Sequence, residues 1–377
     1  MKINLIEIYQ SDPFDNLQGG GVRYVKNLTL SLKGCNKILF LGVGKKEYVR
    51  ENISFSPITK KMTEYVQFLI RLSFHIVFKK LNSYQIAHVH RLYFALPFIL
   101  LKPKLKLVCT IHSPSFNVFK SKYGNTLLYF IRPFFKLIEI FCIKNIDHLV
   151  PVSNSVLDTY YQKYPKLMSK KEITILGSMI DRNLFKIKQS SYLQDRFGKT
   201  NKYLLFIGRL AHVKNIDFLI EMFDKQFKAD ENIKFIIVGR GEYETKVKAW
   251  IESAINKPIL LGEVESDQIP DLISSANILL LSSHYEASPT VVKEALLCGI
   301  PVVTSDVGDV NELIISNRNG FVVEKKYENY SDAIKTLLKK DISKSNIQNY
   351  SIERIQENFI ETISDKYLDI FKKVITE

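Results

Sequence analysis

The chain has 377 residues, 46% of them hydrophobic, and a formal net charge of +14 at pH 7. This length exceeds the size at which one hydrophobic core usually suffices, so two domains are expected. No run of 18 apolar residues is free of charge, because even residues 126–143 contain Arg132, Lys136 and Glu139, and this excludes a membrane-spanning helix. The four cysteines stand far apart without the spacing of metal ligands and are expected to be buried thiols.

The amino-terminal half alternates apolar strand candidates with helical segments, which predicts an α/β fold with a parallel sheet. Residues 3–9 are expected to form the first strand and not a secretory signal, since the apolar run is short and contains Glu7. A cytoplasmic location is therefore expected. His88 and His90 alternate along a later strand, where we expect them to support the site. The further strands are expected at 37–43, 86–90, 105–111 and 148–152.

Polar or flexible residues follow three of these strands. Gly19 to Gly21 precede a helix expected at 22–32, so the backbone there can approach a phosphate or a sugar closely. His112 follows its strand at the carboxyl end, which is the edge where open α/β sheets bind ligands. Ser153 is expected to cap a helix at 155–163 and not to act as a nucleophile.

The positive charge is unevenly distributed along the chain. The first 180 residues hold 26 Lys or Arg against 10 Asp or Glu, whereas the remainder holds 27 against 29. The basic half also carries the aromatic segments 65–78, 93–98 and 116–141. Such a surface suits anionic lipid, where each nearby cation contributes about 1 kcal/mol, so we expect peripheral association with the inner face of the cytoplasmic membrane. The alternative is that the aromatic residues fill the core and the lysines are solvated. No motif points to nucleic acid.

The second half follows a polar boundary at 181–202 and opens with an apolar strand at 203–207. Gly208 ends that strand and permits a tight turn, after which Arg209 and Lys214 follow within one short loop. Two cations so placed could neutralise a diphosphate, Arg as a planar fork and Lys as a point charge. The alternative is a pair of solvated surface cations.

A further polar group follows the strand expected at 277–281. Ser288 is expected to cap a helix whose first residue is Pro289, because proline lacks the amide hydrogen that this position leaves unused. The free amides at the start of this helix are suited to bind phosphate. Glu286 before the helix and Glu294 inside it could reach a sugar and a ribose diol.

Together with Gly239-Arg240-Gly241-Glu242, Asp147 to Ser153 and Cys298 to Val303, these motifs resemble those of the retaining glycosyltransferases of the GT-B fold. The similarity is to the family 4 group, which builds bacterial surface polysaccharides and glycolipids, and it extends along nearly the whole chain. The resemblance implies two Rossmann-like parallel-sheet domains facing a cleft, with a C-terminal helix crossing back to the first domain.

We expect the acceptor-binding domain at 1–185, the nucleotide-sugar-binding domain at 200–350 and the returning segment at 351–377, with an amphipathic helix at 352–374. The resemblance implies that Arg209 and Lys214 bind the donor diphosphate and that Glu294 holds the ribose. His112 and Glu286 are the implied catalytic residues. The implied donor-binding residues are Gly20, Gly21, Gly208, Arg209, Lys214, Gly239, Val264, Ser288, Pro289, Thr290, Val291 and Glu294.

The chain departs from the family pattern at two positions. Gly308-Asp309 stands where members usually have two glycines, and an acid so near a donor could narrow the choice of sugar. Ser178 lies near a junction that often carries Asn-Gly, and no role is transferred to it. No Asp-x-Asp pair occurs in the chain, which argues against a metal-dependent GT-A arrangement. Neither a metal nor a cofactor is expected.

The expected function is retaining, metal-independent transfer of a sugar from a nucleotide-sugar donor, with UDP-sugar favoured, to a glycan or lipid-linked acceptor. This activity would serve the synthesis of a cell-surface polysaccharide such as a capsule or lipopolysaccharide. The alternatives are a GT-B nucleotide-sugar epimerase, against which the paired acids argue, and a non-catalytic nucleotide-sugar-binding protein. A dehydrogenase is disfavoured because Glu244 replaces the third glycine of the dinucleotide fingerprint.

Overall fold

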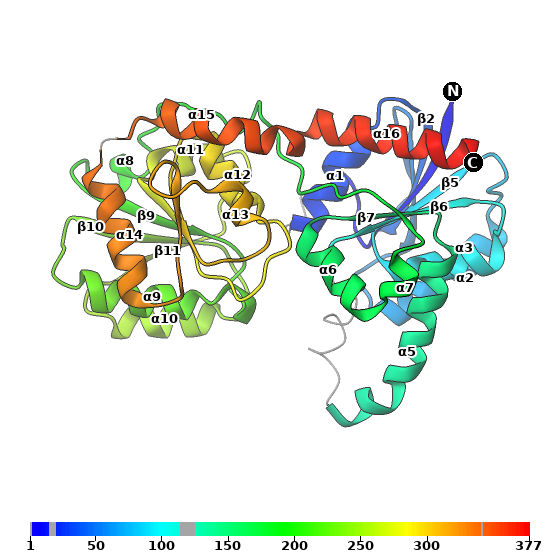
Figure 1. The fold of residues 1–377 in the computed structure, drawn as a ribbon, viewed down its shortest axis with the longest axis horizontal. Coiled ribbons are helices and arrows are strands. Elements are labelled where there is room, and N and C mark those ends of the chain that lie inside the picture. Colours follow the sequence, from blue (N-terminus) through cyan, green and yellow to red (C-terminus); the bar gives the residue numbers. More distant parts are fainter. Residues whose placement is uncertain (1, 15–19, 114–124, 341) are drawn as a thin grey trace. The chain divides into compact units, whose positions relative to one another are not determined.

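The computed structural model describes residues 2–14, 20–113, 125–340 and 342–377, with the backbone alone for the helical residues 125–133. The chain forms two compact units, each built on one parallel sheet with helices (Figure 1). The first unit comprises Met1–Met179 and Ile360–Glu377, and the second comprises Ile180–Phe359. The predicted α/β class is confirmed, and the domain limits expected from the sequence differ from these units at each junction.

The sheet of the first unit has eight strands, in the order β3-β4-β2-β1-β5-β6-β7-β8. The strands are β1 (Ile3–Ile8), β2 (Cys35–Val43), β3 (Tyr48–Arg50), β4 (Ile53–Thr59), β5 (Ile86–Val89), β6 (Lys106–Ile111), β7 (His148–Pro151) and β8 (Glu172–Ile173). The helices are α1 (Gly20–Ser31), α2 (Tyr65–Phe78), η1 (Leu92–Ala95), α3 (Leu96–Leu101), α5 (Asn125–Asn145), α6 (Asn154–Lys163), α7 (Pro165–Met168) and α16 (Ile360–Thr376).

Neighbouring strands of this sheet are parallel except β3 and β4, which form an antiparallel pair. The inner strands are apolar and buried, because helices cover both faces of a parallel sheet. The strands β2 and β4 lie on one side of β1, and β5 and the later strands lie on its other side. The direction in which strands are added therefore reverses between β1 and β5. Sheets of this kind bind ligands outside the carboxyl ends of the strands at such a reversal.

The helix α1 begins at Gly20, earlier than predicted, so Gly20 and Gly21 are helical residues and not part of a turn before the helix. A Cβ atom at Gly21 would lie 2.6 Å from Oη of Tyr9, whereas no atom lies within 4 Å of the same position at Gly20. Gly21 therefore lets α1 pack against the residue that follows β1. Gly19 lies outside the described residues.

The prediction of a single helix at 352–374 is wrong. This region contains the end of α15 (Lys344–Ile355), the short helix η3 (Gln356–Asn358), the extended residue Phe359 and most of α16. The backbone at Phe359 is extended and forms an isolated parallel bridge with Ile180. The helix α16 does return to the first unit, as predicted, where Tyr367 and Ser364 contact α1 through the hydroxyls of Tyr24 and Ser31.

The sheet of the second unit has six strands, all parallel, in the order β11-β10-β9-β12-β13-β14. The strands are β9 (Lys202–Ile207), β10 (Ile233–Val238), β11 (Ile259–Gly262), β12 (Ile278–Leu281), β13 (Val302–Thr304) and β14 (Gly320–Val322). The helices are α8 (Gln194–Phe197), η2 (His212–Lys214), α9 (Ile216–Phe227), α10 (Glu244–Ser253), α11 (Ile269–Ser275), α12 (Thr290–Leu297), α13 (Val310–Leu313) and α14 (Tyr327–Lys339), followed by α15 and η3.

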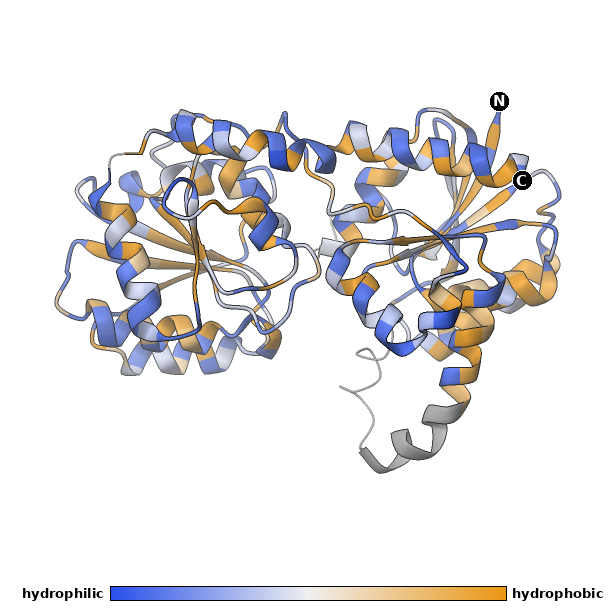
Figure 2. Ribbon diagram, in the orientation of Figure 1, coloured by the Kyte–Doolittle hydropathy of each residue, from blue (hydrophilic) through white to orange (hydrophobic). Residues whose placement is uncertain are grey.

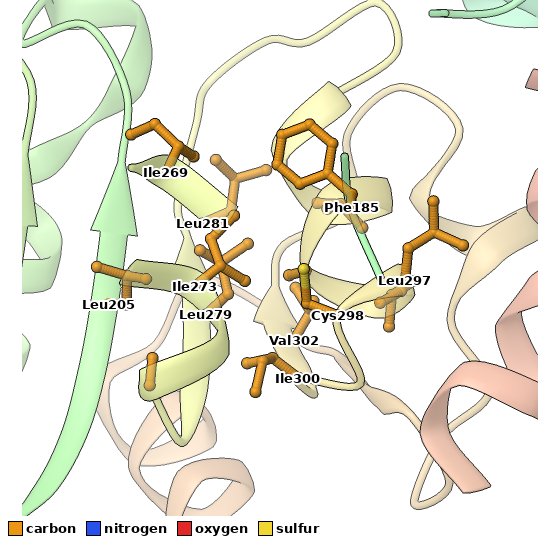
Figure 3. Close-up of a cluster of buried hydrophobic side chains, with 14 of the residues drawn as sticks. Phe185, Leu205, Ile269, Ile273, Leu279, Leu281, Leu297, Cys298, Ile300 and Val302 are labelled. Carbon is orange, nitrogen blue, oxygen red and sulfur yellow. The ribbon is translucent and has the colours of Figure 1, made fainter. Parts of the chain in front are cut away.

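Apolar side chains pack on both faces of this second sheet. Leu205 of β9 and Leu279 of β12 belong to the cluster that includes α11 and α12, shown in Figure 3. Leu204 and Phe206, which point the other way from β9, belong to the cluster with α9 and α14. The strands are accordingly mostly apolar, with Lys202 and Lys234 near the starts of β9 and β10, whereas the helices carry polar residues on their outer side (Figure 2). The reversal of this sheet falls between β9 and β12.

Candidate functional site

Lys214 and Glu286 meet at the reversal of the second sheet, although 72 positions separate them in the sequence. The Nζ atom of Lys214 lies 2.5 Å from Oε1 of Glu286, and the hydroxyl of Ser283 donates to the same oxygen at 2.7 Å. Both partners are partly exposed. The fold therefore brings the cation predicted for the diphosphate into contact with the acid predicted for the sugar.

The loops after β9 and β12 are joined by hydrogen bonds from side chains to backbone carbonyls. Asn215 adopts the left-handed conformation with φ of 51°, which asparagine tolerates better than most residues. Its side-chain amide donates to the carbonyl of Ser282 at 3.2 Å, and the hydroxyl of Ser282 donates to the carbonyl of Asn215 at 2.8 Å. These bonds fix the backbone beside Lys214 relative to the end of β12.

Arg209 lies at the same edge, directly after Gly208, and its side chain is exposed. Within the described ranges it forms no ion pair. The amide of Gly208 donates to the carbonyl of Val238 at 3.0 Å, which ties the start of this loop to β10. Arg209 thus offers a guanidinium that a bound anion can reach without displacing another carboxylate.

Glycines allow the loops after β9 and β10 to touch. Gly239 has φ of +135°, and a Cβ atom there would lie 1.9 Å from the carbonyl oxygen of Gly208. Gly239 was predicted to bind the donor, and its packing against Gly208 leaves no room for a side chain at this position. Val264 follows β11 and packs, partly buried, against the cluster of α11 and α12.

The helix α12 begins at Thr290 and Pro289 occupies its cap position, so the prediction that Pro289 is the first helical residue is wrong. The Ser288 hydroxyl donates to Oδ2 of Asp309 at 2.7 Å and accepts from Nζ of Lys293 at 2.6 Å. Thr290 and Val291 are the first helical residues, whose amides have no partner within the helix.

Lys293 and Asp309 form an ion pair of 2.6 Å beneath the start of α12. The side chain of Lys293 is fully buried and that of Asp309 is nearly so. Gly308, the residue before Asp309, has φ of +61°, and a Cβ atom at Gly308 would lie 2.9 Å from the carbonyl oxygen of Ala287. The pair therefore ties the loop at Asp309 to the segment that carries Glu286, while Glu294 lies buried in the second turn of α12.

In the first unit, His112 follows β6 and is the partly exposed end of a buried hydrogen-bonded chain. Its Nε2 lies 3.2 Å from Nδ1 of His90, whose Nε2 lies 2.9 Å from Oε2 of Glu7. The other carboxylate oxygen, Oε1, lies 2.9 Å from Nδ1 of His88. The two histidines expected to support the site therefore share one buried carboxylate.

The series of hydrogen-bonded contacts continues from His88 to α16. Nε2 of His88 lies 2.7 Å from Oγ1 of Thr110, which lies 2.6 Å from Oη of Tyr367. The Tyr367 hydroxyl also lies 2.9 Å from that of Tyr24 on α1. Residues from β1, β5, β6, α1 and α16 are thus joined in one network.

The environment sets the charge of this network. Burial raises the pKa of Glu7, but the charges and hydrogen bonds of His88 and His90 outweigh it and lower this pKa to about 2. Burial lowers the pKa of His90 to about 4 and that of His112 well below its usual range. At neutral pH, Glu7 is therefore a carboxylate while His90 and His112 are neutral.

Glu7, His88 and His90 are also the described residues that best resemble a metal site, since their ligand atoms all lie within 4.8 Å of one another. Each histidine nitrogen that faces the carboxylate is already within hydrogen-bond distance of it. The outer nitrogens of the two rings face Thr110 and His112. Hydrogen bonding therefore accounts for all four ring nitrogens without an ion.

An apolar cavity adjoins His112 within the first unit. Its polar end contains His90, Arg91 and His112, and the guanidinium of Arg91 lies 4.5 Å from the centre of the Tyr65 ring. The apolar walls come from α2, η1, α3 and α5, with Leu69, Phe94, Leu96, Phe135 and Ile138 among their residues. This combination suits a ligand that has both a polar and an apolar part.

The structure thus brings together Arg209, Lys214, Glu286 and the start of α12 at one edge, and places His112, Gly20 and Gly21 in the other unit. The pairing of Glu7 with the histidines was missed from the sequence. A signal was present, because a charged residue inside an apolar strand requires a buried partner. The Lys293–Asp309 pair was also missed, since its two members are not close in sequence.

Two family descriptions match the chain in tandem. Residues 18–184 match Glycosyltransferase Family 4, and residues 193–354 match Glycosyl transferases group 1. N-acetyl-alpha-D-glucosaminyl L-malate synthase of Bacillus anthracis is 23% identical over 278 residues, which cover 73% of this chain and 69% of that protein. The residues that match the two family descriptions include His112 in the first and Lys214 and Glu286 in the second.

Solved structures share the fold over nearly the full length. Sucrose-phosphate synthase from Thermosynechococcus elongatus is similar with a TM-score of 0.81 at 16% identity, covering 100% of both chains. HepE from Anabaena in complex with UDP-glucose is similar with a TM-score of 0.75 at 17% identity, covering 98% of this chain and 100% of that one. At this identity the likeness shows the fold alone.

Proposed function

Because this chain belongs to the GT-B glycosyltransferases of the family 4 type, we propose that it transfers a hexose from a UDP-sugar to a glycan or lipid-linked acceptor of a cell-surface polysaccharide, with retention of anomeric configuration. The observation that carries this proposal is the contact between Lys214 and Glu286 at the reversal of the second sheet, with the exposed Arg209 at the same edge. Open α/β sheets bind their ligands there. The UDP-glucose in the similar HepE structure supports the choice of donor.

In this proposal the donor diphosphate lies between the two cations and the start of α12. An ammonium group has three donors, so Lys214 can keep its bond to Glu286 while it binds a phosphate oxygen. Arg209 adds a planar pair of donors, and the amides of Thr290 and Val291 add a positive dipole end. Glu294 binds the ribose, and Glu286 binds the transferred sugar.

The same groups lower the barrier of the reaction. The bond between the anomeric carbon and the diphosphate oxygen breaks, and the leaving diphosphate gains a negative charge that Arg209, Lys214 and the helix amides stabilise. The acceptor hydroxyl attacks from the face that the diphosphate leaves, and its proton passes to the departing phosphate oxygen. His112 is the catalytic residue proposed in the first unit. This sequence needs no metal ion.

Thermal unfolding with UDP, GDP, CMP and their sugars, in the absence of divalent metal, tests the donor site. UDP or a UDP-sugar is expected to raise the melting temperature of the native protein, and Arg209→Ala and Glu294→Ala should abolish the rise. Arg318→Ala is the matched control, because Arg318 is exposed in the same unit but lies before β14, at the opposite edge of the sheet. A rise that survives both site substitutions would contradict the proposed donor site.

We also propose that the first unit binds an anionic membrane surface through α2, α3 and α5. The helix α3 contacts both α2 and α5, and the three helices are rich in apolar residues (Figure 2). Phe74 and Phe78 on α2 are 63% and 83% exposed, and Leu137 on α5 is 65% exposed. The exposed cations on or beside these helices include Arg71, Lys80, Lys104, Lys136 and Lys144. Among the described helices none is long and apolar enough to cross a bilayer.

Co-sedimentation with vesicles tests this surface. Binding is expected with vesicles that contain phosphatidylglycerol, weakly or not at all with phosphatidylcholine alone, and less at high salt. The double substitution Phe74→Ser and Phe78→Ser should reduce binding, whereas Ile255→Ser should not, because Ile255 is 73% exposed but lies in the second unit. Binding that depends neither on the content of anionic lipid nor on the salt concentration would refute the proposal.

A further inference from the structure

The donor and the acceptor can be assigned in each of the buried hydrogen bonds that lead from Glu7 to His112. Glu7 is a carboxylate and can only accept hydrogen bonds, so His90 must donate to it from Nε2. A neutral imidazole carries one proton, and His90 therefore presents an unprotonated Nδ1 to His112. The 3.2 Å contact between these rings requires His112 to be the donor, through Nε2.

This assignment fixes the other nitrogen of His112. With its single proton on Nε2, the neutral ring keeps a lone pair on Nδ1. The His112 ring packs edge-to-face against the ring of Tyr24, with 4.9 Å between the two ring centroids and an angle of 84° between the ring planes. His112 is partly exposed and lines the cavity at the end of β6 and β5.

We propose that Glu7 and His90 are positioning residues that hold His112 as the Nε2-protonated tautomer, with Nδ1 as a hydrogen-bond acceptor for a hydroxyl of the transferred sugar or the acceptor. This inference rests on the proposed function, in which His112 is a catalytic residue. It adds two residues, both fully buried, that act on the substrate only through His112.

The second oxygen of Glu7 keeps the carboxylate in place. His88 contacts Oε1, and His88 is in turn held by Thr110, which contacts Tyr367 of α16. A carboxylate bound through both oxygens cannot rotate away from His90. The last helix therefore contributes to the orientation of His112, directly after β6, through five successive hydrogen-bonded contacts.

Two substitutions of His90 separate positioning from packing. His90→Phe fills a similar volume but can neither donate to Glu7 nor accept from His112. His90→Gln retains an amide N–H₂ for Glu7 and a carbonyl oxygen for His112. We expect kcat to fall by roughly 10²-fold in His90→Phe and to recover largely in His90→Gln, with the UDP-induced rise in melting temperature unchanged in both.

The tautomer is measured directly by ¹⁵N NMR of histidine-labelled protein, in which protonated and unprotonated ring nitrogens resonate separately. His112 should show a protonated Nε2 in the native protein and in His90→Gln, and a mixture in His90→Phe. His148→Gln is the control, because His148 is a buried histidine of the same unit that pairs with Thr174 instead. It should change stability without changing kcat or the His112 resonances.

The outcomes distinguish this inference from the proposed function. Full activity in His112→Ala would remove the premise that His112 is a catalytic residue. Loss of activity in His112→Ala together with an unchanged tautomer and kcat in His90→Phe would overturn the positioning role alone. A stoichiometric metal ion in the purified protein that is lost in Glu7→Gln would also overturn it, because the histidines would then be ligands.

Discussion

Lys293 carries its ammonium group in a position with no exposure to solvent, and Asp309 lies 2.6 Å from it. Removing one member of a buried pair leaves the other charge without compensation, at a cost of about 3–5 kcal/mol. We expect Lys293→Met to destabilise the second unit by this amount. The double substitution Lys293→Met with Asp309→Gly removes both charges and restores the two glycines usual in the family, so most of the stability should return.

Urea unfolding followed by tryptophan fluorescence measures this effect, because Trp250 on α10 is the single tryptophan of the chain and lies in the second unit. The double variant should unfold at a higher urea concentration than the single variant. If the two variants unfold together, the charge pair is not the source of the loss.

The buried histidines make the first unit sensitive to acid. Burial lowers the pKa of His90 to about 4 from its ordinary value of 6.5, and it lowers the pKa of His112 in the same direction. Between these two pH values the unfolded chain binds more protons than the folded one. The free energy of unfolding therefore falls as the pH falls from 6.5 to 4, by up to about 1.4 kcal/mol per pH unit for each proton.

Urea unfolding followed by circular dichroism near pH 7 and near pH 5 checks this expectation. The first unit should lose stability at the lower pH, and His90→Gln, which has no titrating ring, should lose less. An identical loss in the two proteins would assign the acid sensitivity to other groups.

At the scale of the elements, the close contact between the ends of β9 and β10 depends on Gly239. Gly239→Ala forces a Cβ atom to within 1.9 Å of the Gly208 carbonyl oxygen, at a positive φ that alanine disfavours. We expect a loss of roughly 3 kcal/mol or more in the second unit, measured by Trp250 fluorescence, together with weaker UDP binding. Gly262→Ala is the control in the same unit, since φ is also positive there, at +73°, but no atom lies within 4 Å of the added methyl group. A stable Gly239→Ala that binds UDP normally would contradict this account.

Elements were predictable from the sequence where their determinants are local. The run at 203–207 is apolar on both faces and forms β9 as expected, and Ser153 caps α6 through the amide of Val156, three positions away. Pro289 occupies the cap position of α12 and not its first helical position. The contacts of the Ser288 hydroxyl with Lys293 and Asp309 were also not predicted, because Asp309 lies 21 positions from Ser288. β4, with polar residues in its run, was missed for a related reason, since only its neighbours β2 and β3 give it a place in the sheet.

The candidate site followed the same rule. Arg209, Lys214, Glu286 and Glu294 stand at strand ends and helix starts that the sequence marks, so they could be proposed from it. The histidine chain could not, because the link from Glu7 to His90 spans 83 positions and depends on the order of β1 and β5 in the sheet.

At the scale of the whole molecule, α16 is part of the first unit although it follows the second in the chain. It buries Ile363, Tyr367, Ile370, Phe371 and Val374 there. Deletion of 360–377 should therefore lower the unfolding transition of the first unit seen by circular dichroism, while the Trp250 transition of the second unit stays in place. A shift of both transitions by the same amount would show that the two units unfold as one.

This order of elements also has a consequence for biosynthesis. The second unit is contiguous and can fold as soon as its last strand and helices leave the ribosome. The first unit cannot be completed until α16 has been made, which at roughly 5–20 residues per second is about 10–40 s after Met179 is added. During that interval the faces of α1 and β6 that receive Tyr367 stay open, so nascent chains arrested before residue 360 should be the ones that molecular chaperones retain.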